Sequence, residues 1–438
     1  MSTPTRLKST SQPLAAAIVT AKSRSTGSST WKVRTARRLV LRSIGRITKG
    51  ELRLVEAPNN DSKSDPAVWL FGQPSEDALH AEITVLDPRF WACMVTGGSL
   101  GAAEAYAEGW WDTNNLTATI RLFARNRDVL QHIDGGLAKW GAPLLRRLHR
   151  ANRNTLQGAK RNIEAHYDLS NEFFSLFLDP TMTYSCGLFD AQSTTLEQAQ
   201  IAKIDHLCRK LELGPDTHLL EVGTGWGAFA LHAAREYGCR VTTTTISKEQ
   251  YAWAKKVIAS AGLEDRVELL LEDYRSLEGK YDRVVSVEMV EAVGADFLGE
   301  YFFTLGNLLK PGGMAAVQAI TIQDQDFESA SRHIDFIKRY IFPGSCIPSV
   351  TAMCQAMTSD SDLKLVHLED FTPHYATTLD RWSVALQAHH DEARAMGLDD
   401  HFLRTWEYYF RYCEGGFAER HVGLVQMMLA KPYLEAPG

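Results

Sequence analysis

Apolar positions recur with two different periods along the chain, and the change of period indicates where one region gives way to the next. Beyond residue 217, short apolar runs alternate with longer stretches in which apolar residues return every three or four positions. The short runs predict buried strands, and the longer stretches predict amphipathic helices. Strands that alternate with helices predict an α/β fold built on a doubly wound, largely parallel sheet. We expect these strands at residues 218–222, 240–245, 266–271, 281–287, 313–321, 363–370 and 422–430.

The region before residue 135 shows a different pattern. Apolar and polar side chains alternate at residues 50–55, 67–72 and 81–86, which predicts short antiparallel strands. Residues 97–112 have helical spacing, and we expect residues 40–135 to form a smaller N-terminal α+β domain. Further helices are expected at residues 31–44, 166–174, 194–212 and 325–342, the last as part of a helical lid at about 325–345.

Charge is unevenly distributed along the 438 residues. The net charge is −6, yet the first 50 residues carry eleven Lys or Arg residues and no acidic residue. We expect residues 1–39 to be a basic, flexible arm and residues 136–162 to be a basic linker. Such segments suit an anionic surface, either membrane or nucleic acid, and a solvated tail or a cleaved targeting segment has the same composition.

Two further features of composition limit the interpretation. The chain contains no apolar run of about 18 residues, so the sequence predicts no membrane-spanning helix. Its seven cysteines are scattered without paired metal-ligand spacing. This usage predicts reduced thiols, a cytoplasmic protein and no metal site.

Residues 219–234 carry the strongest indication of a ligand site. A short apolar strand containing Glu221 is followed by Gly223, Gly225 and Gly227, then by a helix. Glycine lets the backbone turn tightly against a ligand, and a helix N-terminus offers free amides. The spacing is neither the G-x-G-x-x-G of dinucleotide folds nor a P-loop, which needs a following Gly-Lys-Ser/Thr. It resembles motif I of class I methyltransferases, which bind S-adenosylmethionine, and a purely structural strand–turn–helix is the alternative.

Polar side chains follow the other predicted strands at the same edge of the sheet, where open α/β folds bind ligands. Glu288 and Glu291 follow the fourth strand, and a helix starting there would place both on one face. A buried carboxylate has to be paired or protonated, so we expect a functional role for Glu291, whereas Glu288 can simply cap the helix. The other strand-end residues are Thr245, Ile246, Gln250, Asp273, Tyr274, Gln318 and Ile320.

Several motifs occur in a recognisable order: His166–Leu169, Asp179–Cys186, the glycine stretch, Ile246–Gln250, Ser286–Gly294 and Arg339–Gly344. Together they closely resemble the cyclopropane-fatty-acid synthase family, whose relatives include the mycolic acid cyclopropane synthases. The resemblance covers about residues 160–435, and residues 98–112 resemble the N-terminal domain of bacterial and plant members. It implies that residues 163–438 form a class I methyltransferase (Rossmann-like) catalytic domain, and that the smaller domain is associated with lipid.

The resemblance also implies a reaction. Members transfer a methyl group from S-adenosylmethionine to the cis double bond of an unsaturated phospholipid acyl chain, and bound bicarbonate removes a proton from the carbocation as a cyclopropane ring closes. A methyl-branched or methylene acyl chain is the alternative product, because the carbocation is shared. The family's bicarbonate site falls on Cys186, Glu291, Ile320, Tyr375 and Gln318. Gln318 replaces a frequent histidine, and it can donate a hydrogen bond but cannot carry a proton.

Further site residues follow from the resemblance and from the strand ends. We expect His166, Tyr167, Phe336 and Tyr340 to contact the substrate, and we expect no nucleophilic role for Cys186. Aromatic rings stabilise a carbocation, and two or three of the following should form the pocket wall: Tyr167, Phe173, Phe174, Tyr184, Phe336, Tyr340 and Phe342. The residues expected to hold S-adenosylmethionine are Tyr184, Ser185, Glu221, Gly223, Gly225, Gly227, Thr245, Ile246, Gln250, Asp273 and Tyr274.

The expected partner is a phospholipid membrane surface. The basic arm, the cluster at 146–161 and the pair Trp110 and Trp111 could attach the protein to the inner face of the membrane, although the tryptophans could equally be core. The family likeness suggests a homodimer. A nucleic-acid methyltransferase would need an Asn/Asp-Pro-Pro-Tyr/Phe motif where residues 288–291 stand, so no nucleic-acid partner is expected. A catalytically silent lipid-binding protein is the remaining alternative.

Overall fold

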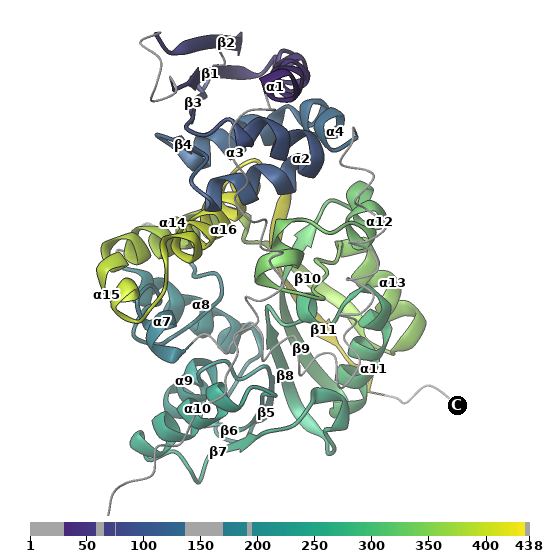
Figure 1. Ribbon diagram of the computed structural model, residues 1–438. Coiled ribbons are helices and arrows are strands. Elements are labelled where there is room, and N and C mark those ends of the chain that lie inside the picture. The colour runs from purple at the N-terminus through teal and green to yellow at the C-terminus, as the bar shows by residue number, and fades with distance from the viewer. Residues whose placement is uncertain (1–29, 58–64, 75, 136–169, 191–194, 434–438) are drawn as a thin grey trace, which may run out of the picture.

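The computed structural model describes residues 30–57, 65–74, 76–135, 170–190 and 195–433. A large sheet runs through the lower half of the molecule in Figure 1, and a small sheet with its own helices packs above it. Most of the predicted arm, the linker at 136–162, and the predicted substrate residues His166 and Tyr167 lie outside the described residues.

The large sheet has seven strands in the order β10-β11-β9-β8-β5-β6-β7. Strands β9, β8, β5, β6 and β7 run parallel, whereas β11 is antiparallel to both β9 and β10. The predicted strands are thereby confirmed, although β9 begins earlier than expected. Their bounds are β5 His218–Val222, β6 Arg240–Thr244, β7 Val267–Leu270, β8 Tyr281–Val287, β9 Leu309–Ile322, β10 Lys364–Asp370 and β11 Val422–Ala430.

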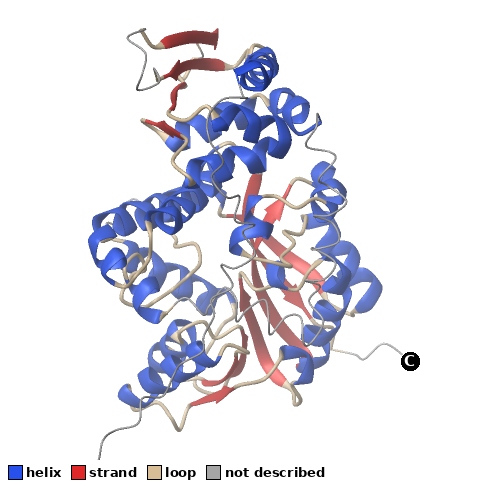
Figure 2. Ribbon diagram, viewed as in Figure 1, coloured by secondary structure: helices blue, strands red, loops and turns tan. Residues whose placement is uncertain are grey.

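Helices cover both faces of this sheet (Figure 2). One face packs against α8 (Leu196–Lys210), α9 (Ala228–Glu236) and α10 (Lys248–Ser260), and the other against α11 (Leu298–Leu308) and α13 (Val350–Asp360). The chain runs outward from β5 through β6 to β7 and then returns to the other side of β5 as β8. This is a doubly wound, Rossmann-like sheet as predicted, and its switch point lies between β5 and β8, where such folds bind ligands.

A layer of aromatic side chains joins the catalytic region to the N-terminal domain. Its rings come chiefly from α7 (Asn171–Ser175), α14 (Thr372–Ala388) and α16 (Asp400–Ala418), and the short helix α15 (His390–Ala395) lies between the last two in the chain. Phe173, Phe177 and Trp406 pack with ring centroids 4.8–5.6 Å apart, a spacing typical of attractive edge-to-face contacts. On the far side of α16, Arg404 donates to the carbonyl oxygens of Tyr106 and Trp111 in the N-terminal domain.

The N-terminal domain contains a small sheet in the order β2-β1-β3-β4. Strand β1 pairs antiparallel with β2 but parallel with β3, so the expectation of a wholly antiparallel arrangement was wrong. Alternation of apolar and polar positions gives a strand's faces but not its direction. The elements are α1 Thr30–Ile44, β1 Gly50–Glu56, β2 Ala67–Gln73, β3 His80–Val85, α2 Arg89–Ala107, β4 Trp111–Thr113, α3 Leu116–Arg125 and α4 Arg127–Gly135.

Helix α1 begins inside the segment predicted as a flexible arm. Ala36, Val40 and Ile44 of this helix are buried in the core that α2 and the small sheet share. We therefore propose that the N-terminal domain starts near residue 30.

The predicted helical region at 97–112 ends earlier than expected, because α2 stops at Ala107 and Trp111 begins strand β4. The Trp111 side chain is 3% exposed and donates to the carbonyl oxygen of Ala102. Trp110 packs against the same core, beneath the Arg89 guanidinium. The tryptophan pair is therefore structural, and the idea that it forms an exposed membrane anchor was wrong.

The predicted lid helix is broken in two. Helix α12 (Asp324–Arg332) ends at His333, whose backbone is extended, and a π-helix, η6 (Ile337–Ile341), follows. The Lys338 ammonium group donates to the carbonyl oxygens of Ala330 and His333 at the break. A lysine that satisfies the free carbonyls of a helix end stabilises the interruption. Among the described residues, no helix is both long and apolar enough to cross a membrane.

Candidate active site

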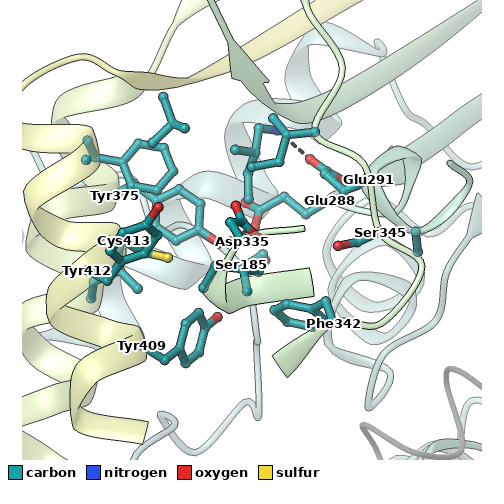
Figure 3. Close-up of a pocket in the computed structure, with 18 of the residues that line it drawn as sticks. Ser185, Glu288, Glu291, Asp335, Phe342, Ser345, Tyr375, Tyr409, Tyr412 and Cys413 are labelled. Atoms are coloured by element: carbon teal, nitrogen blue, oxygen red, sulfur yellow. Dashed lines mark hydrogen bonds between the residues drawn. The ribbon is translucent and has the colours of Figure 1, made fainter. Parts of the chain in front are cut away.

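A cavity of about 770 Å³ lies between the carboxyl edge of the large sheet and the N-terminal domain. Its sheet end is lined by Gly223, Gly225 and Gln250, and its far end by apolar side chains that include Ile83 and Phe123. Figure 3 shows Tyr409 and Tyr412 of α16 on one side of the pocket, with Glu291 and Ser345 on the opposite side. One continuous space therefore joins a polar site at the switch point to an apolar chamber.

The glycine turn after β5 forms the polar end. Gly223 and Gly225 have φ angles of +102° and +53°, and a Cβ at Gly225 would have no protein atom within 4 Å. Only glycine adopts this backbone freely, and the open space next to it leaves room for a ligand. Gly227 differs, because it does not line the cavity and a Cβ there would lie 3.4 Å from Ala254 of α10. Gly227 thus serves helix packing rather than direct ligand contact.

The ends of β6 and β7 supply the next residues of the polar end. The Thr245 hydroxyl donates to Gln250 Oε1 at 3.0 Å, which leaves the Gln250 amide NH₂ facing the cavity region. Asp273 accepts two hydrogen bonds from the Arg275 guanidinium, at 2.8 and 2.7 Å. Tyr274 opens the short 3₁₀ helix η3 (Tyr274–Ser276) and lines the cavity, as does Ile246. All these predicted cofactor residues therefore meet in one place.

Glu221 lies beneath the glycine turn on β5. It is 4% exposed, lines the cavity and accepts a 2.6 Å hydrogen bond from the Thr243 hydroxyl. Burial raises the pKa of Glu221 to about 8. The side chain is therefore largely protonated near neutral pH unless a cation approaches it.

A buried polar pair on α8 supports the predicted residue Ser185. Lys203 donates to Ser185 Oγ, and Gln200 donates to the Ser185 carbonyl oxygen, both at 2.7 Å. Burial lowers the pKa of Lys203, while the nearby charge of Glu288 opposes that shift. The sequence interpretation missed both residues, although Gln200 and Lys203 fall on the otherwise apolar face of α8 and could have been noticed there.

Glu288 is the centre of the hydrogen-bond network at the end of β8. Its carboxylate accepts from Cys186 N at 2.9 Å, from Gln318 Nε2 at 2.8 Å and from Tyr375 Oη at 2.5 Å. Burial raises the pKa of Glu288, and these donors together with the Lys203 charge oppose the shift. Of the two roles left open for Glu288, a simple helix cap does not account for these three contacts.

Glu291 lies beside Glu288, across the pocket from Tyr409 and Tyr412 (Figure 3), in a 3₁₀ helix, η4 (Val290–Ala292), instead of sharing an α-helical face with Glu288. Its Oε1 accepts from Ile320 N at 2.5 Å, shown by the dashed line in Figure 3. Its Oε2 has no hydrogen-bond partner among the described residues. Burial and the neighbouring Glu288 charge raise the pKa of Glu291 to about 8.

Cys186 contributes its backbone to the site. Its thiol is buried, and burial followed by the Glu288 charge raises the pKa of Cys186 well above the ordinary value. A thiol held protonated is a poor nucleophile. This geometry agrees with the prediction that Cys186 does not act as one.

Two of the aromatic rings predicted for the pocket wall lie at the cavity. Tyr184 and Phe342 line the cavity, whereas Phe173 and Phe174 are buried in the aromatic core. Phe336, predicted to contact substrate, instead packs on Tyr408 with ring centroids 4.9 Å apart and does not line the cavity.

Tyr340, the other described residue predicted to contact substrate, also lies away from the cavity. Its side chain is 37% exposed, and its hydroxyl donates to Glu104 of α2. Both residues lie at the π-helix that follows the break in the lid helix, and Ile337 of the same segment lines the cavity instead.

The donor set fits one expected small molecule and not the other. S-adenosylmethionine carries hydroxyl, amino and charged groups, and the open glycine turn, Gln250, Asp273 and the partnerless Glu291 oxygen offer matching contacts. Bicarbonate would need the donors of Cys186 and Tyr375, but these already bond a carboxylate of the protein. The structure thus supports the first ligand and leaves the second without free donors.

The sequence is similar to known lipid-modifying enzymes. The model of one protein family, mycolic acid cyclopropane synthetase, matches residues 154–427. Tuberculostearic acid methyltransferase UfaA1 of Mycobacterium tuberculosis is 38% identical over 343 residues, which cover 76% of this chain and 79% of that protein. The cyclopropane-fatty-acyl-phospholipid synthase of Escherichia coli is 34% identical over 359 residues, which cover 80% and 88% of the two chains.

The fold is also similar to a solved structure of a related enzyme. The mycolic acid cyclopropane synthase CmaA1, in a complex with SAH and CTAB, aligns with a TM-score of 0.59 and 33% identity. The alignment covers 62% of this chain and 98% of that chain.

Proposed function

Because the chain belongs to the mycolic acid cyclopropane synthetase family of S-adenosylmethionine-dependent methyltransferases, we propose that it methylates the cis double bond of unsaturated phospholipid acyl chains. The favoured product is a cyclopropane ring. The single observation that carries the proposal is the continuous cavity between the glycine turn and the apolar chamber of the N-terminal domain.

The two ends of the cavity suit the two substrates. The polar end presents the glycine turn and Gln250, which would hold S-adenosylmethionine, the source of the methyl group when it is bound. The apolar end, with Ile83, Phe90 and Phe123, suits a hydrocarbon chain. Arg127 and Asp326, paired at 2.7 Å between α4 and α12, line the same cavity and provide a polar rim for a headgroup.

The residues of the chain would act chiefly by orientation and by exclusion of water. An alkene has no proton to lose before it attacks a methyl group, so no base is needed for that step and alignment supplies much of the rate. Tyr184 and Phe342 would place electron-rich faces beside the positive charge that develops on the acyl chain. A carboxylate would then be needed to take up a proton, and Glu288 and Glu291 line this part of the cavity.

The outer face of the N-terminal domain supports attachment to the inner, cytoplasmic surface of a membrane. On α1, Trp31 and Leu39 are 62% and 47% exposed beside Arg38 and Arg42. On the edge strand β2, Leu70 is 76% exposed. Basic and apolar groups on one surface suit an anionic lipid interface. We also propose a homodimer, for which the mass of the purified protein in solution is the test.

A methyl-branched or methylene acyl chain is the second candidate product. It is favoured by the relative named tuberculostearic acid methyltransferase and by Gln318, which cannot carry a proton. The product would be decided by how the carbocation is deprotonated, within the same fold and the same cofactor site.

Incubation of the purified protein with unsaturated phospholipid vesicles and methyl-labelled S-adenosylmethionine tests the proposal. Mass spectrometry should show a gain of one CH₂ per modified chain, and NMR should show a ring in place of the double bond. A methylene or methyl branch would move the assignment to the second product. Absence of label from lipid would refute both.

A further inference from the structure

The anion-binding donors at the end of β8 already hold a carboxylate of the chain itself. Cys186 N, Gln318 Nε2 and Tyr375 Oη donate to Glu288 at 2.9, 2.8 and 2.5 Å. These donors come from three of the five residues to which the family resemblance assigns bicarbonate. The side chain of Glu288 thus takes the hydrogen bonds that a dissolved anion would be expected to receive.

A second anion on the same donors would enter a site that already contains two carboxyl groups. Burial and the Glu288 charge raise the pKa of Glu291 to about 8. Glu291 therefore keeps its proton at neutral pH, with one anion already beside it. The buried cation Lys203, whose charge acts on Glu288, donates to Ser185. Another negative charge would gain no new donor and would meet like charge in a low-dielectric site, which is unfavourable.

The backbone at Glu288 provides an independent observation. Its φ angle is +49°, in the left-handed region that residues other than glycine rarely adopt. Strained residues of this kind gather at functional sites, where the surrounding structure holds them in place. Here the turn directs the carboxylate across the sheet toward Gln318 of the neighbouring strand β9.

The position of Glu288 relative to the cavity gives it access to a substrate. Glu288 and Tyr375 line the cavity, whereas Cys186 and Gln318 are not among the described residues that do. Two of the three donors therefore hold the carboxylate from outside the cavity, while Glu288 itself lines the space proposed for the acyl chain.

We propose that the Glu288 carboxylate takes the place of bicarbonate as the proton acceptor of the reaction. The inference rests on the function proposed above. A C–H bond of the newly added methyl group breaks, its electron pair forms the carbon–carbon bond that closes the ring, and the proton passes to a Glu288 oxygen. The proton then leaves to water as the product departs, which restores the carboxylate.

Two substitutions of Glu288 distinguish its role as proton acceptor from its role as occupant of the three hydrogen-bond donors. Glu288→Gly suits the left-handed backbone and frees the three donors for an external anion. Glu288→Gln keeps the shape of the side chain but cannot accept a proton. Glu278→Gln, on an exposed turn away from the cavity, is the matched control.

Turnover on labelled vesicles is measured in buffer freed of carbon dioxide and again with added bicarbonate. We expect the wild-type rate to be the same in both and the Glu288→Gly rate to fall roughly 100-fold without bicarbonate, the usual loss for a removed general base. Added bicarbonate should raise the turnover rate of Glu288→Gly at least about tenfold and should leave the rate of Glu288→Gln unchanged. Unchanged binding of S-adenosylhomocysteine by calorimetry shows that each variant is folded.

A titration with carbon-13-labelled bicarbonate, followed by NMR, gives a readout that does not depend on activity. We expect saturable binding to Glu288→Gly and none to the wild type. Saturable binding to the wild type, loss of wild-type turnover on removal of carbon dioxide, or full turnover of Glu288→Gly would overturn the inference. If the wild type labels no lipid in either buffer, the proposed function fails, and the titration still decides whether Glu288 excludes the anion.

Discussion

The Tyr375 hydroxyl donates to Glu288 Oε2 at 2.5 Å and so connects α14 to the turn after β8. The Tyr375 ring stacks on Phe417 with centroids 4.4 Å apart, which fixes the hydroxyl in this direction. The contact therefore joins the aromatic layer to the carboxylate at the switch point.

Loss of this hydroxyl should impair turnover without unfolding the protein. In Tyr375→Phe the ring still stacks on Phe417, but the carboxylate loses one donor, and we expect kcat/KM to fall roughly 10- to 100-fold. The Tyr375 hydrogen bond lowers the pKa of Glu288, so its loss raises that pKa while Cys186, Lys203 and Glu291 remain in place. Since a base must be unprotonated, the acidic limb of the pH–rate profile should move to higher pH. An unmoved limb would contradict the assignment.

Gly225→Ala should weaken cofactor binding. A methyl group there projects into the open polar end of the cavity from a backbone with φ of +53°, and we expect the Kd for S-adenosylhomocysteine to rise at least about tenfold by calorimetry. Gly262→Ala is the matched control, because its φ is +65°, its Cβ would also meet nothing within 4 Å, and it lies outside the cavity. Both variants carry similar backbone strain, so equal losses of affinity would attribute the effect to strain alone.

The stability of the ligand-free protein should depend on the protonation of Glu291. Its pKa is raised from 4.5 to about 8, so the folded state keeps a proton that the unfolded state releases between these values. This contribution is fully present below pH 4.5 and is lost as the pH rises toward 8. Glu291→Gln imitates the protonated form, so its free energy of unfolding relative to wild type should increase by on the order of 3 kcal/mol from pH 5 to pH 8.5.

Thermal or urea unfolding at several pH values measures this difference. Glu278→Gln, an exposed substitution of the same chemistry, should show a constant difference from wild type. A constant difference for Glu291→Gln as well would mean that Glu291 is ionised in the folded protein.

Charge reversal on α1 should weaken membrane attachment. Arg38→Glu with Arg42→Glu replaces two exposed cations beside Leu39, and we expect binding to anionic vesicles to fall at least roughly tenfold at low salt. Lys255→Glu with Lys256→Glu makes the same change on α10, at the opposite end of the molecule in Figure 1. Sedimentation with vesicles should show weaker binding for the α1 double variant than for the α10 double variant. Equal losses would show that net charge, and not the α1 face, controls binding.

Filling the apolar chamber should change the choice of acyl chain. Ala124 on α3 lines the cavity, and Ala124→Leu would reduce the space available there. We expect the preference for long over short monounsaturated chains to fall by roughly tenfold, with unchanged binding of S-adenosylhomocysteine. An unchanged chain preference would place the hydrocarbon elsewhere.

The sequence predicted the strands of the large sheet and most of the polar end of the site, because buried strands and glycine turns are recorded in local patterns. Gly223, Gly225, Gln250 and Tyr274 accordingly meet where strand order places them. The central position of Glu288 was missed because it depends on contacts across the sheet. Val287 pairs with Gln318, and a polar residue inside a buried strand needs a partner, so the polar Gln318 was the available signal.

The predicted lid helix contains a break that the sequence pattern did not predict. Residues 325–342 have helical spacing, but the break at His333 is stabilised by the ammonium group of Lys338, which reaches back to the free carbonyls. Periodicity records which residues share a helical face, and it does not record a side chain that ends a helix from a later position. Phe336 and Tyr340, which were expected to contact substrate, lie in this segment and outside the cavity.

The cavity wall is assembled from two separate parts of the chain, with Gly225 and Gln250 from one and Ile83 and Phe123 from the other. The glycine turn and these apolar residues of the wall are thus encoded by different stretches of the gene. Under the proposed function, mutation of the codons for β3 and α3 would alter the preference for acyl chains, while the codons for the glycine turn and Gln250 are inherited unchanged.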